Sequence, residues 1–148
     1  ESLDNVQYTV TKCGLDAVQL HGEESPEFAA ELRVPVIKCF RVKGTVDPHF
    51  VKRWRVWIYL FDTYSAQNRG GTGHAFDWEW LKEVRHLPNV ALAGGINAAN
   101  ASEAIRAVKP RILDVSSGVE REDGGKDWAK IRELMDKVRE ADINVSRQ

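Results

Sequence analysis

Five short apolar runs, separated by stretches with helical spacing, constrain the fold of this chain more than any other feature. The runs are residues 17–20, 36–40, 57–61, 90–93 and 112–115. Most are too continuously apolar for a sheet with one solvent-exposed face. They are typical of parallel strands that helices cover. Their alternation with helices predicts an α/β fold with a parallel sheet and right-handed crossovers. We expect one helix followed by five strand–helix units.

Helix signals between the apolar runs support this order. Ser25-Pro26 and Asp47-Pro48 each place a capping residue before a proline at the first helical position. Apolar spacing predicts four more helices: one that ends at Gly14, one over 76–84, one that begins at Asn97 or Asn100, and one that begins at Asp127. An open doubly wound sheet and part of a closed (βα)8 barrel both fit, and pattern alone does not separate them.

Size and charge narrow the functional classes. The 148 residues are expected to form a single domain, and a formal charge of −1 gives no electrostatic footprint for nucleic acid or an anionic membrane. No apolar run reaches the 18 or more residues of a membrane span. The two cysteines are too few for a disulfide scaffold, and no His, Cys or Asp group has metal-ligand spacing. We expect a cytoplasmic protein that binds neither nucleic acid nor membranes.

A polar or glycine-rich element follows each predicted strand. In both architectures the active site lies beyond the carboxyl ends of the strands. The elements are His21-Gly22-Glu23, Arg41, Asp62-Thr63, Gly94-Gly95 and Ser116-Ser117-Gly118. Each has a simple structural explanation by itself, but five of them along one rim predict a functional site there.

Two of these elements predict a phosphate site. Gly94-Gly95 and Ser116-Ser117-Gly118 follow the last two strands. Glycines let the backbone approach a ligand and expose its N–H groups, and a following helix start favours an anion. In a barrel the loops after the last two strands are the usual phosphate site. A tight turn is the alternative for either loop alone.

Three titratable residues are candidates for catalysis or binding. Asp62 ends the most aromatic strand, where an apolar wall would raise its pKa and suit it to general acid catalysis, with a helix or turn cap as the alternative. His21 could be a ligand, an acid/base group or a polar strand end, and the residues alone favour the strand end. Asp114 lies near the end of an apolar strand, so its charge must be paired with another group, be hydrated, or take part in binding or catalysis. The long stretch 63–75 is predicted to form a lid or binding loop.

The two cysteines are expected to be structural. Cys13 ends a helix before the first strand, so it belongs to the opposite face from the other candidates. Cys39 lies in the middle of a strand and is expected in the core.

An ordered set of motifs resembles the phosphoribosylanthranilate isomerase family of tryptophan biosynthesis. The matching segments are residues 15–22, 61–63, 70–73, 76–78, 92–96, 114–120 and 126–127. Any one motif is weak, but their order and spacing run through almost the whole chain.

The resemblance implies a (βα)8 barrel without a cofactor. Family members open the ribose ring of N-(5'-phosphoribosyl)anthranilate and carry out an Amadori rearrangement to 1-(2-carboxyphenylamino)-1-deoxyribulose 5-phosphate. By resemblance, Asp62 is the general acid, and His21 and Asp114 line the substrate cavity. The phosphate is held in the loops of Gly94, Gly95, Ser117 and Gly118. This agrees with the residues selected from the strand ends.

The resemblance also implies that part of the barrel is absent. The five predicted strands correspond to strands four to eight of the family, and a (βα)8 barrel takes about 250 residues. The family's general base, a cysteine in a Lys-x-Cys-Gly motif, belongs to the first strand. Lys12-Cys13-Gly14 is not that site, because the motif of residues 15–22 follows at once. The family's arginine that binds the anthranilate carboxylate also belongs to the missing part. We therefore expect residues 1–148 to be the C-terminal part of a barrel that is inactive alone. No residue here is assigned as the general base or as the group that binds the carboxylate.

The expected partner is a small phosphorylated substrate. Open strand edges favour self-association. The family implies fusion to, or pairing with, indole-glycerol-phosphate synthase as a further arrangement. Two other interpretations stay open: another phosphate-binding barrel enzyme of the tryptophan or histidine pathway, and a non-catalytic fragment that binds phosphate.

Overall fold

The computed structural model describes residues 1–63 and 77–145, with only the backbone described for Thr63 and for residues 143–145. Five strands form one sheet in the order β1-β2-β3-β4-β5, and every neighbouring pair is parallel. The strands are β1 (Val18–Leu20), β2 (Val36–Val42), β3 (Ile58–Thr63), β4 (Val90–Leu92) and β5 (Ile112–Leu113). The structure thus confirms the predicted parallel α/β fold, with all five strands in sequence order.

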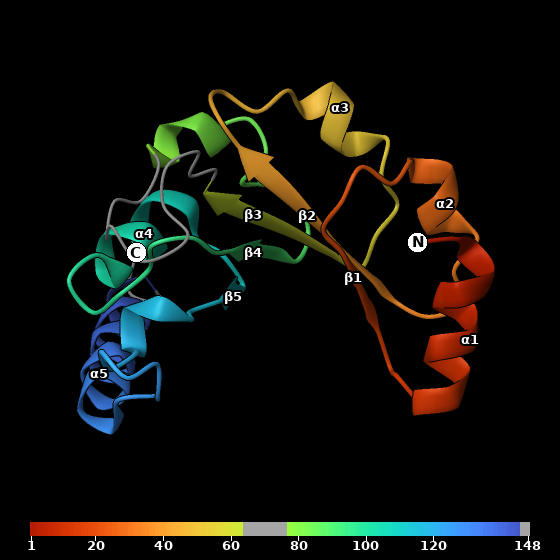
Figure 1. Ribbon diagram of the computed structural model, residues 1–148. Coiled ribbons are helices and arrows are strands. Elements are labelled where there is room, and N and C mark those ends of the chain that lie inside the picture. The colour runs from red at the N-terminus through yellow and green to blue at the C-terminus, as the bar shows by residue number, and fades with distance from the viewer. Residues whose placement is uncertain (64–76, 146–148) are drawn as a thin grey trace.

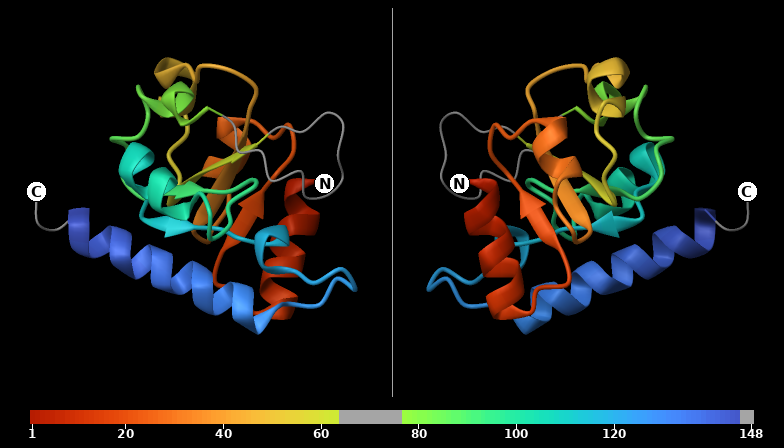
Figure 2. Two further views of the ribbon diagram at one scale, coloured as in Figure 1. Left: turned by 90° about the vertical axis from the view of Figure 1, so that its left-hand side faces the viewer. Right: turned by 90° about the vertical axis from the view of Figure 1, so that its right-hand side faces the viewer.

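Helices cover the outer face of the curved sheet. They are α1 (Leu3–Cys13), α2 (Pro26–Ala30), α3 (Pro48–Lys52), the 3-10 helix η1 (Trp78–Leu81), α4 (Ala101–Val108), the 3-10 helix η2 (Ser117–Val119) and α5 (Trp128–Val145). In Figure 1 they follow the arc of the sheet from α1 at one end to α5 at the other, and the concave face is turned away from them. The last turns of α5 extend beyond the other elements (Figure 2). Among the described helices, none has the length and apolar character to cross a membrane.

Local signals fix the helix ends much as the sequence predicts. The Ser25 hydroxyl accepts a hydrogen bond from the Phe28 N–H at 3.2 Å, and Asp47 caps α3 through the His49 N–H at 2.8 Å. Gly14 ends α1 in the left-handed conformation, with φ of 62°. Asp127 accepts from the N–H of Ala129 at 2.8 Å at the start of α5. These caps supply partners for backbone groups that the first and last turns leave unpaired.

The helix predicted over residues 76–84 is wrong in length and type. The described part of this stretch holds only the 3-10 helix η1, followed by turns up to His86. The spacing of its buried side chains does not distinguish the two kinds of helix. Leu81 and Val84 are both fully buried and lie three residues apart, a spacing that a 3-10 turn satisfies as well as an α-helix does.

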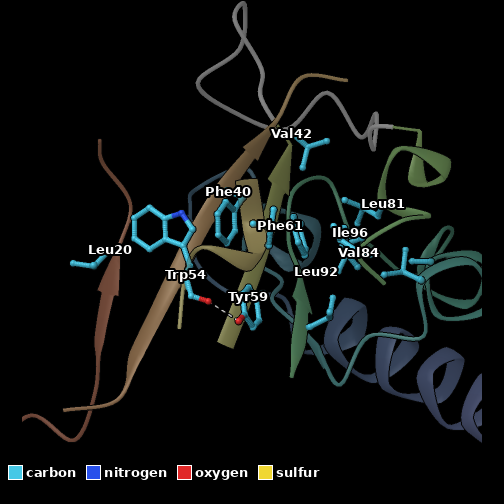
Figure 3. Close-up of a cluster of buried hydrophobic side chains, with 14 of the residues drawn as sticks. Leu20, Phe40, Val42, Trp54, Tyr59, Phe61, Leu81, Val84, Leu92 and Ile96 are labelled. Carbon is cyan, nitrogen blue, oxygen red and sulfur yellow. Dashed lines mark hydrogen bonds between the residues drawn. The ribbon is translucent and has the colours of Figure 1, made fainter. Parts of the chain in front are cut away.

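The two faces of the sheet carry different side chains. The face under the helices is aromatic: Phe40 stacks on Phe61 with ring centroids 5.5 Å apart, and the Tyr59 hydroxyl donates to the Trp54 carbonyl at 2.8 Å (Figure 3). The concave face has a smaller buried cluster, made of Cys39, Ile58, Leu60, Ala91 and Ala93. Strand alternation separates the two sets, because consecutive residues point to opposite faces. The helix-covered face therefore holds most of the core.

Candidate functional site at the carboxyl ends of the strands

Three potential ligand or proton-transfer groups meet on one face of the sheet, from the end of β1, the middle of β2 and the end of β3. A ring nitrogen of His21, the Sγ of Cys39 and a carboxylate oxygen of Asp62 all lie within 4.8 Å of one another. Leu20 pairs with Lys38, so His21 continues the register beside Cys39, and Arg41 pairs with Asp62 in the next strand pair. The parallel register thus places all three side chains on the concave face.

Burial differs sharply among these three residues. His21 is exposed, Asp62 is half-buried, and Cys39 is 4% exposed. Desolvation raises the pKa of the Cys39 thiol to about 11, and the negative charge of Asp62 acts in the same direction. Cys39 is buried, as the sequence predicts. Its place beside His21 and Asp62 was missed, because register between strands leaves no mark in the spacing along the chain.

Asp114 lies at the same rim but at the other end of the sheet. It directly follows β5, and its N–H donates to the Leu92 carbonyl at 2.9 Å. Since Leu92 pairs with Leu113 under the helices, Asp114 falls on the concave face beside Ala93. Asp114 is exposed, so hydration satisfies its charge. Its carboxylate also adds to the negative potential at Cys39.

The two glycine loops adopt backbone conformations that need glycine. Gly94 and Gly95 have φ of 82° and 68°, in the left-handed region that disfavours side chains. Gly118 lies against the backbone of the other loop, because a Cβ atom on Gly118 would collide with the Ile96 carbonyl oxygen. The loops after β4 and β5, which carry the predicted phosphate residues Gly94, Gly95, Ser117 and Gly118, are therefore in direct contact.

Two asparagines hold the first loop in place. The Asn100 amide donates to the Gly95 carbonyl at 2.9 Å, and its oxygen accepts from the Asn97 N–H at 2.9 Å. The Asn97 amide also reaches the Gly95 carbonyl at 3.2 Å. The sequence predicts a helix cap at one of these residues. Asn100 does occupy the N-cap position of α4, but its side chain makes no capping hydrogen bond to the helix and serves the loop instead.

Contacts of the Lys126 side chain hold the second loop in place. Lys126 Nζ lies 2.7 Å from the Glu120 carboxylate and donates to the Ser116 carbonyl at 3.0 Å. The hydrogen bond from Lys126, helped by one from the Ser116 hydroxyl, lowers the pKa of Glu120. Because these contacts start at Ser116, they hold the residues next to Ser117 and Gly118.

A cavity of about 710 Å³ opens between the carboxyl ends of β1 and β2 and the start of α3. His21, Cys39 and Arg41 belong to its lining. On its other side, the buried Lys38 bonds to the Glu24 carboxylate at 2.7 Å and to the Gly22 carbonyl at 2.8 Å.

The Glu24 carboxyl of this ion pair has a shifted pKa. Desolvation opposes its ionisation, but the hydrogen bonds from Lys38 and from backbone N–H groups outweigh desolvation and keep the pKa of Glu24 below its ordinary value. The glycine-rich segment 70–73 lies outside the described residues, so the predicted lid or binding loop stays a prediction.

Known proteins match this arrangement in both sequence and fold. The model of the family described as N-(5'phosphoribosyl)anthranilate (PRA) isomerase matches residues 1–137. An N-(5'-phosphoribosyl)anthranilate isomerase from Syntrophomonas wolfei is 49% identical over 140 residues, which cover 95% of this chain. The chain belongs to the phosphoribosylanthranilate isomerase family. The family resemblance found in the motifs is thereby confirmed.

Solved structures of the phosphoribosylanthranilate isomerase family share the fold. The enzyme from Thermus thermophilus superposes with a TM-score of 0.80 at 32% identity and covers 95% of this chain. An isomerase solved in complex with reduced 1-(o-carboxyphenylamino)-1-deoxyribulose 5-phosphate superposes with a TM-score of 0.76 at 32% identity, over 94% of this chain.

The chain spans about two thirds of the length of these proteins. The matched region is 69% of the Syntrophomonas wolfei relative and 65% of the relative from Citrifermentans bemidjiense. It is 68% of the Thermus thermophilus chain and 67% of the chain solved in complex.

Proposed function

We propose that this chain carries the general acid and the phosphate site of an isomerase that converts N-(5'-phosphoribosyl)anthranilate to its 1-deoxyribulose 5-phosphate isomer. One observation carries the proposal beyond family membership. A half-buried carboxylate, Asp62, ends the central strand of the sheet beside His21, at the rim where two touching glycine loops follow β4 and β5.

The reaction begins with a proton donor. Opening the ribose ring needs a proton on the ring oxygen, and we assign its donation to Asp62, the half-buried carboxyl at this rim. Isomerisation then moves a proton from C2' to C1', which needs a base. By family resemblance, His21 and Asp114 are proposed to contact the substrate on the same face, and neither is assigned as that base.

The phosphate binds away from the reacting atoms. Gly94, Gly95, Ser117 and Gly118 offer backbone N–H groups and a hydroxyl on one surface, which suits a phosphate monoester. The ligand of the solved complex carries a 5-phosphate at one end and a carboxyphenylamino group at the other. Binding energy from the remote phosphate can then orient the ribose against Asp62.

In this proposal the five strands correspond to strands four to eight of a (βα)8 barrel, and residues 1–148 form its C-terminal part. Two observations support it: in the described sheet β1 and β5 have one neighbour each, and the matched relatives are longer. Cys13 is exposed at the end of α1, before β1, so it does not supply the base at the opposite rim. The chain alone is expected to bind the phosphorylated ligand without turning it over.

The test joins this chain to the segment of the Syntrophomonas wolfei relative that it does not match. The chimera should isomerise the substrate, measured by the loss of anthranilate fluorescence. Asp62→Asn should lower kcat at least about 100-fold with little change in KM, because a general acid acts mainly in the transition state. Asp16→Asn, an exposed carboxylate before β1, is the matched control and should leave both constants unchanged.

Two results would count against this assignment. Near-normal turnover of the Asp62→Asn chimera would remove Asp62 as the acid, and turnover by the chain alone would show that it contains a base. Binding of the phosphorylated ligand without turnover in the chimera would favour the non-catalytic interpretation.

Open edges also favour self-association of the chain. The backbone groups of β1 and β5 that face away from the sheet can pair with another strand. One solved relative, from Thermotoga maritima, is described as mutually generated monomers of a dimeric isomerase. A molecular mass near that of a dimer in light scattering would support association of this chain, and a strictly monomeric species at high concentration would refute it.

A further inference from the structure

His21, Cys39 and Asp62 offer three different donor atoms to one point on the concave face. One is an imidazole nitrogen, one a thiol sulfur and one a carboxylate oxygen, and all lie within 4.8 Å of one another. In a tetrahedral zinc site, metal–ligand bonds of about 2.0–2.3 Å place the ligand atoms roughly 3.5 Å apart. The three atoms lie within about 1 Å of that spacing, and His21 is the exposed member of the three, with the most room to change its rotamer.

The donor set selects the kind of ion. Sulfur and imidazole ligands favour Zn²⁺ and its neighbours in the transition series, whereas Mg²⁺ and Ca²⁺ prefer oxygen ligands alone. The surrounding charges also suit a cation. Asp62 and Asp114 act on Cys39 with negative charge and Arg41 and Lys38 with positive charge, but Lys38 is already paired with Glu24 at 2.7 Å.

The geometry points to a binding site for one Zn²⁺ ion, held by His21, Cys39 and Asp62 with water in the fourth position. Binding forms a bond between the metal and Cys39 Sγ and releases the thiol proton to solvent, with no change in oxidation state. The buried Cys39 and half-buried Asp62 supply the rigid side of the site, and the exposed His21 closes it. Three protein ligands with water in the fourth position are typical of open zinc sites rather than of closed structural ones.

Such an ion would compete with the substrate. His21 and Asp62 belong to the isomerase site proposed above, so an ion bound there would block both the acid and the cavity. This competition rests on the proposed function, whereas metal binding itself does not. Zn²⁺ would thus act as an inhibitor of the isomerase rather than as its cofactor.

Co²⁺ is the probe for the site, because it replaces Zn²⁺ and its bonds to thiolate absorb in the near ultraviolet. Titration of the unmodified chain should give one Co²⁺ per chain, with a thiolate-to-metal band that Zn²⁺ abolishes. Cys39→Ser should remove the band. His21→Asn and Asp62→Asn should each weaken binding by at least about 10-fold, which is the loss expected even for groups that only support metal ligands.

Cys13→Ser is the matched control, since Cys13 is exposed and lies outside the site. It should leave the spectrum and the affinity unchanged. A band lost in Cys13→Ser, retained in Cys39→Ser, or never formed would overturn the proposal. Far-ultraviolet circular dichroism checks that Cys39→Ser folds. Should it not fold, the exposed His21→Asn decides the outcome, because unchanged Co²⁺ affinity in that variant also refutes the site. None of these readouts depends on isomerase activity.

Discussion

The two faces of the sheet differ in what their side chains do, although they alternate residue by residue along the same strands. Under the helices, Phe40 and Phe61 stack within a large aromatic core. On the concave face the buried cluster is smaller and has no aromatic ring, and His21, Cys39 and Asp62 meet there. Large apolar side chains contribute most to stability, while small ones leave room for a ligand. Along each strand, residues that stabilise the fold therefore alternate with residues that face the candidate site, because consecutive side chains point to opposite faces.

Lys38 and Cys39 show this division at its sharpest. The Lys38 side chain is buried on the helix side, where its ammonium bonds to Glu24 and lies 4.8 Å from the centre of the Trp54 ring. The next residue, Cys39, points to the concave face and joins the candidate site. Both are buried, but Lys38 carries a charge that a fixed partner satisfies, whereas the Cys39 thiol has a raised pKa and is uncharged. We therefore expect substitutions at Lys38 to change stability and those at Cys39 to change binding.

The largest expected effect is at the aromatic core. Phe61→Ala should lower the free energy of unfolding by about 4 kcal/mol, because it removes a fully buried ring and leaves a cavity under the helices. Cys39→Ala, which removes only one buried atom from the concave face, should cost about 1 kcal/mol. Urea denaturation followed by tryptophan fluorescence measures both. An equal loss in the two variants would mean that the faces do not differ in their contribution to stability.

A smaller loss is expected at the buried ion pair. Lys38→Met keeps the length of the side chain but leaves the Glu24 carboxylate and the Gly22 carbonyl without their donor. We expect a loss of about 2 kcal/mol in urea denaturation. Lys52→Met, at an exposed lysine of α3, is the matched control and should change stability by less than about 0.5 kcal/mol. A loss at Lys38 no larger than at Lys52 would show that the ion pair is not a stabilising contact.

The fold followed from the sequence because its signals are local. The apolar runs predicted five parallel strands, and caps such as Ser25 and Asp47 fixed helix starts. The helix over residues 76–84 failed because Leu81 and Val84 satisfy a repeat of three as well as one of 3.6. Contact with the rest of the core, rather than local spacing, decides between those two structures.

The site was predictable only in part. Residues at strand ends, including His21 and Asp62, follow from topology alone, because parallel strands carry their carboxyl ends to one rim. Cys39 was assigned to the core, since its approach to His21 depends on the register of β1 against β2. Asn100 was assigned to a cap, and its bond to Gly95 depends on how the loop folds back. Neither the register nor the loop path is encoded in a local pattern.

A substitution in the first glycine loop should weaken phosphate binding at the concave rim more than it lowers the stability of the fold. Asn100→Ala removes the amide that donates to the Gly95 carbonyl and accepts from Asn97. We expect a cost of about 1 kcal/mol in stability and a several-fold weaker affinity for inorganic phosphate, measured by calorimetry. Asn5→Ala, in the exposed first turn of α1, should change neither. Unchanged phosphate affinity in Asn100→Ala would separate this loop from the phosphate site.

The smallest expected effect is a pH dependence on the helix side, carried by Glu24. Its pKa is lowered in the folded chain, so the stabilisation is present above the unfolded pKa of about 4.3 and is lost as the pH falls through the folded value. Because Glu24 is partly exposed, we expect at most about 1 kcal/mol. Glu24→Gln should flatten the fall in stability between about pH 5 and pH 3. Glu23→Gln, at the exposed neighbour, should keep the wild-type slope. If the two variants have the same slope, then Lys38 is held by its other contacts, and the charge of Glu24 adds nothing to the stability of this face.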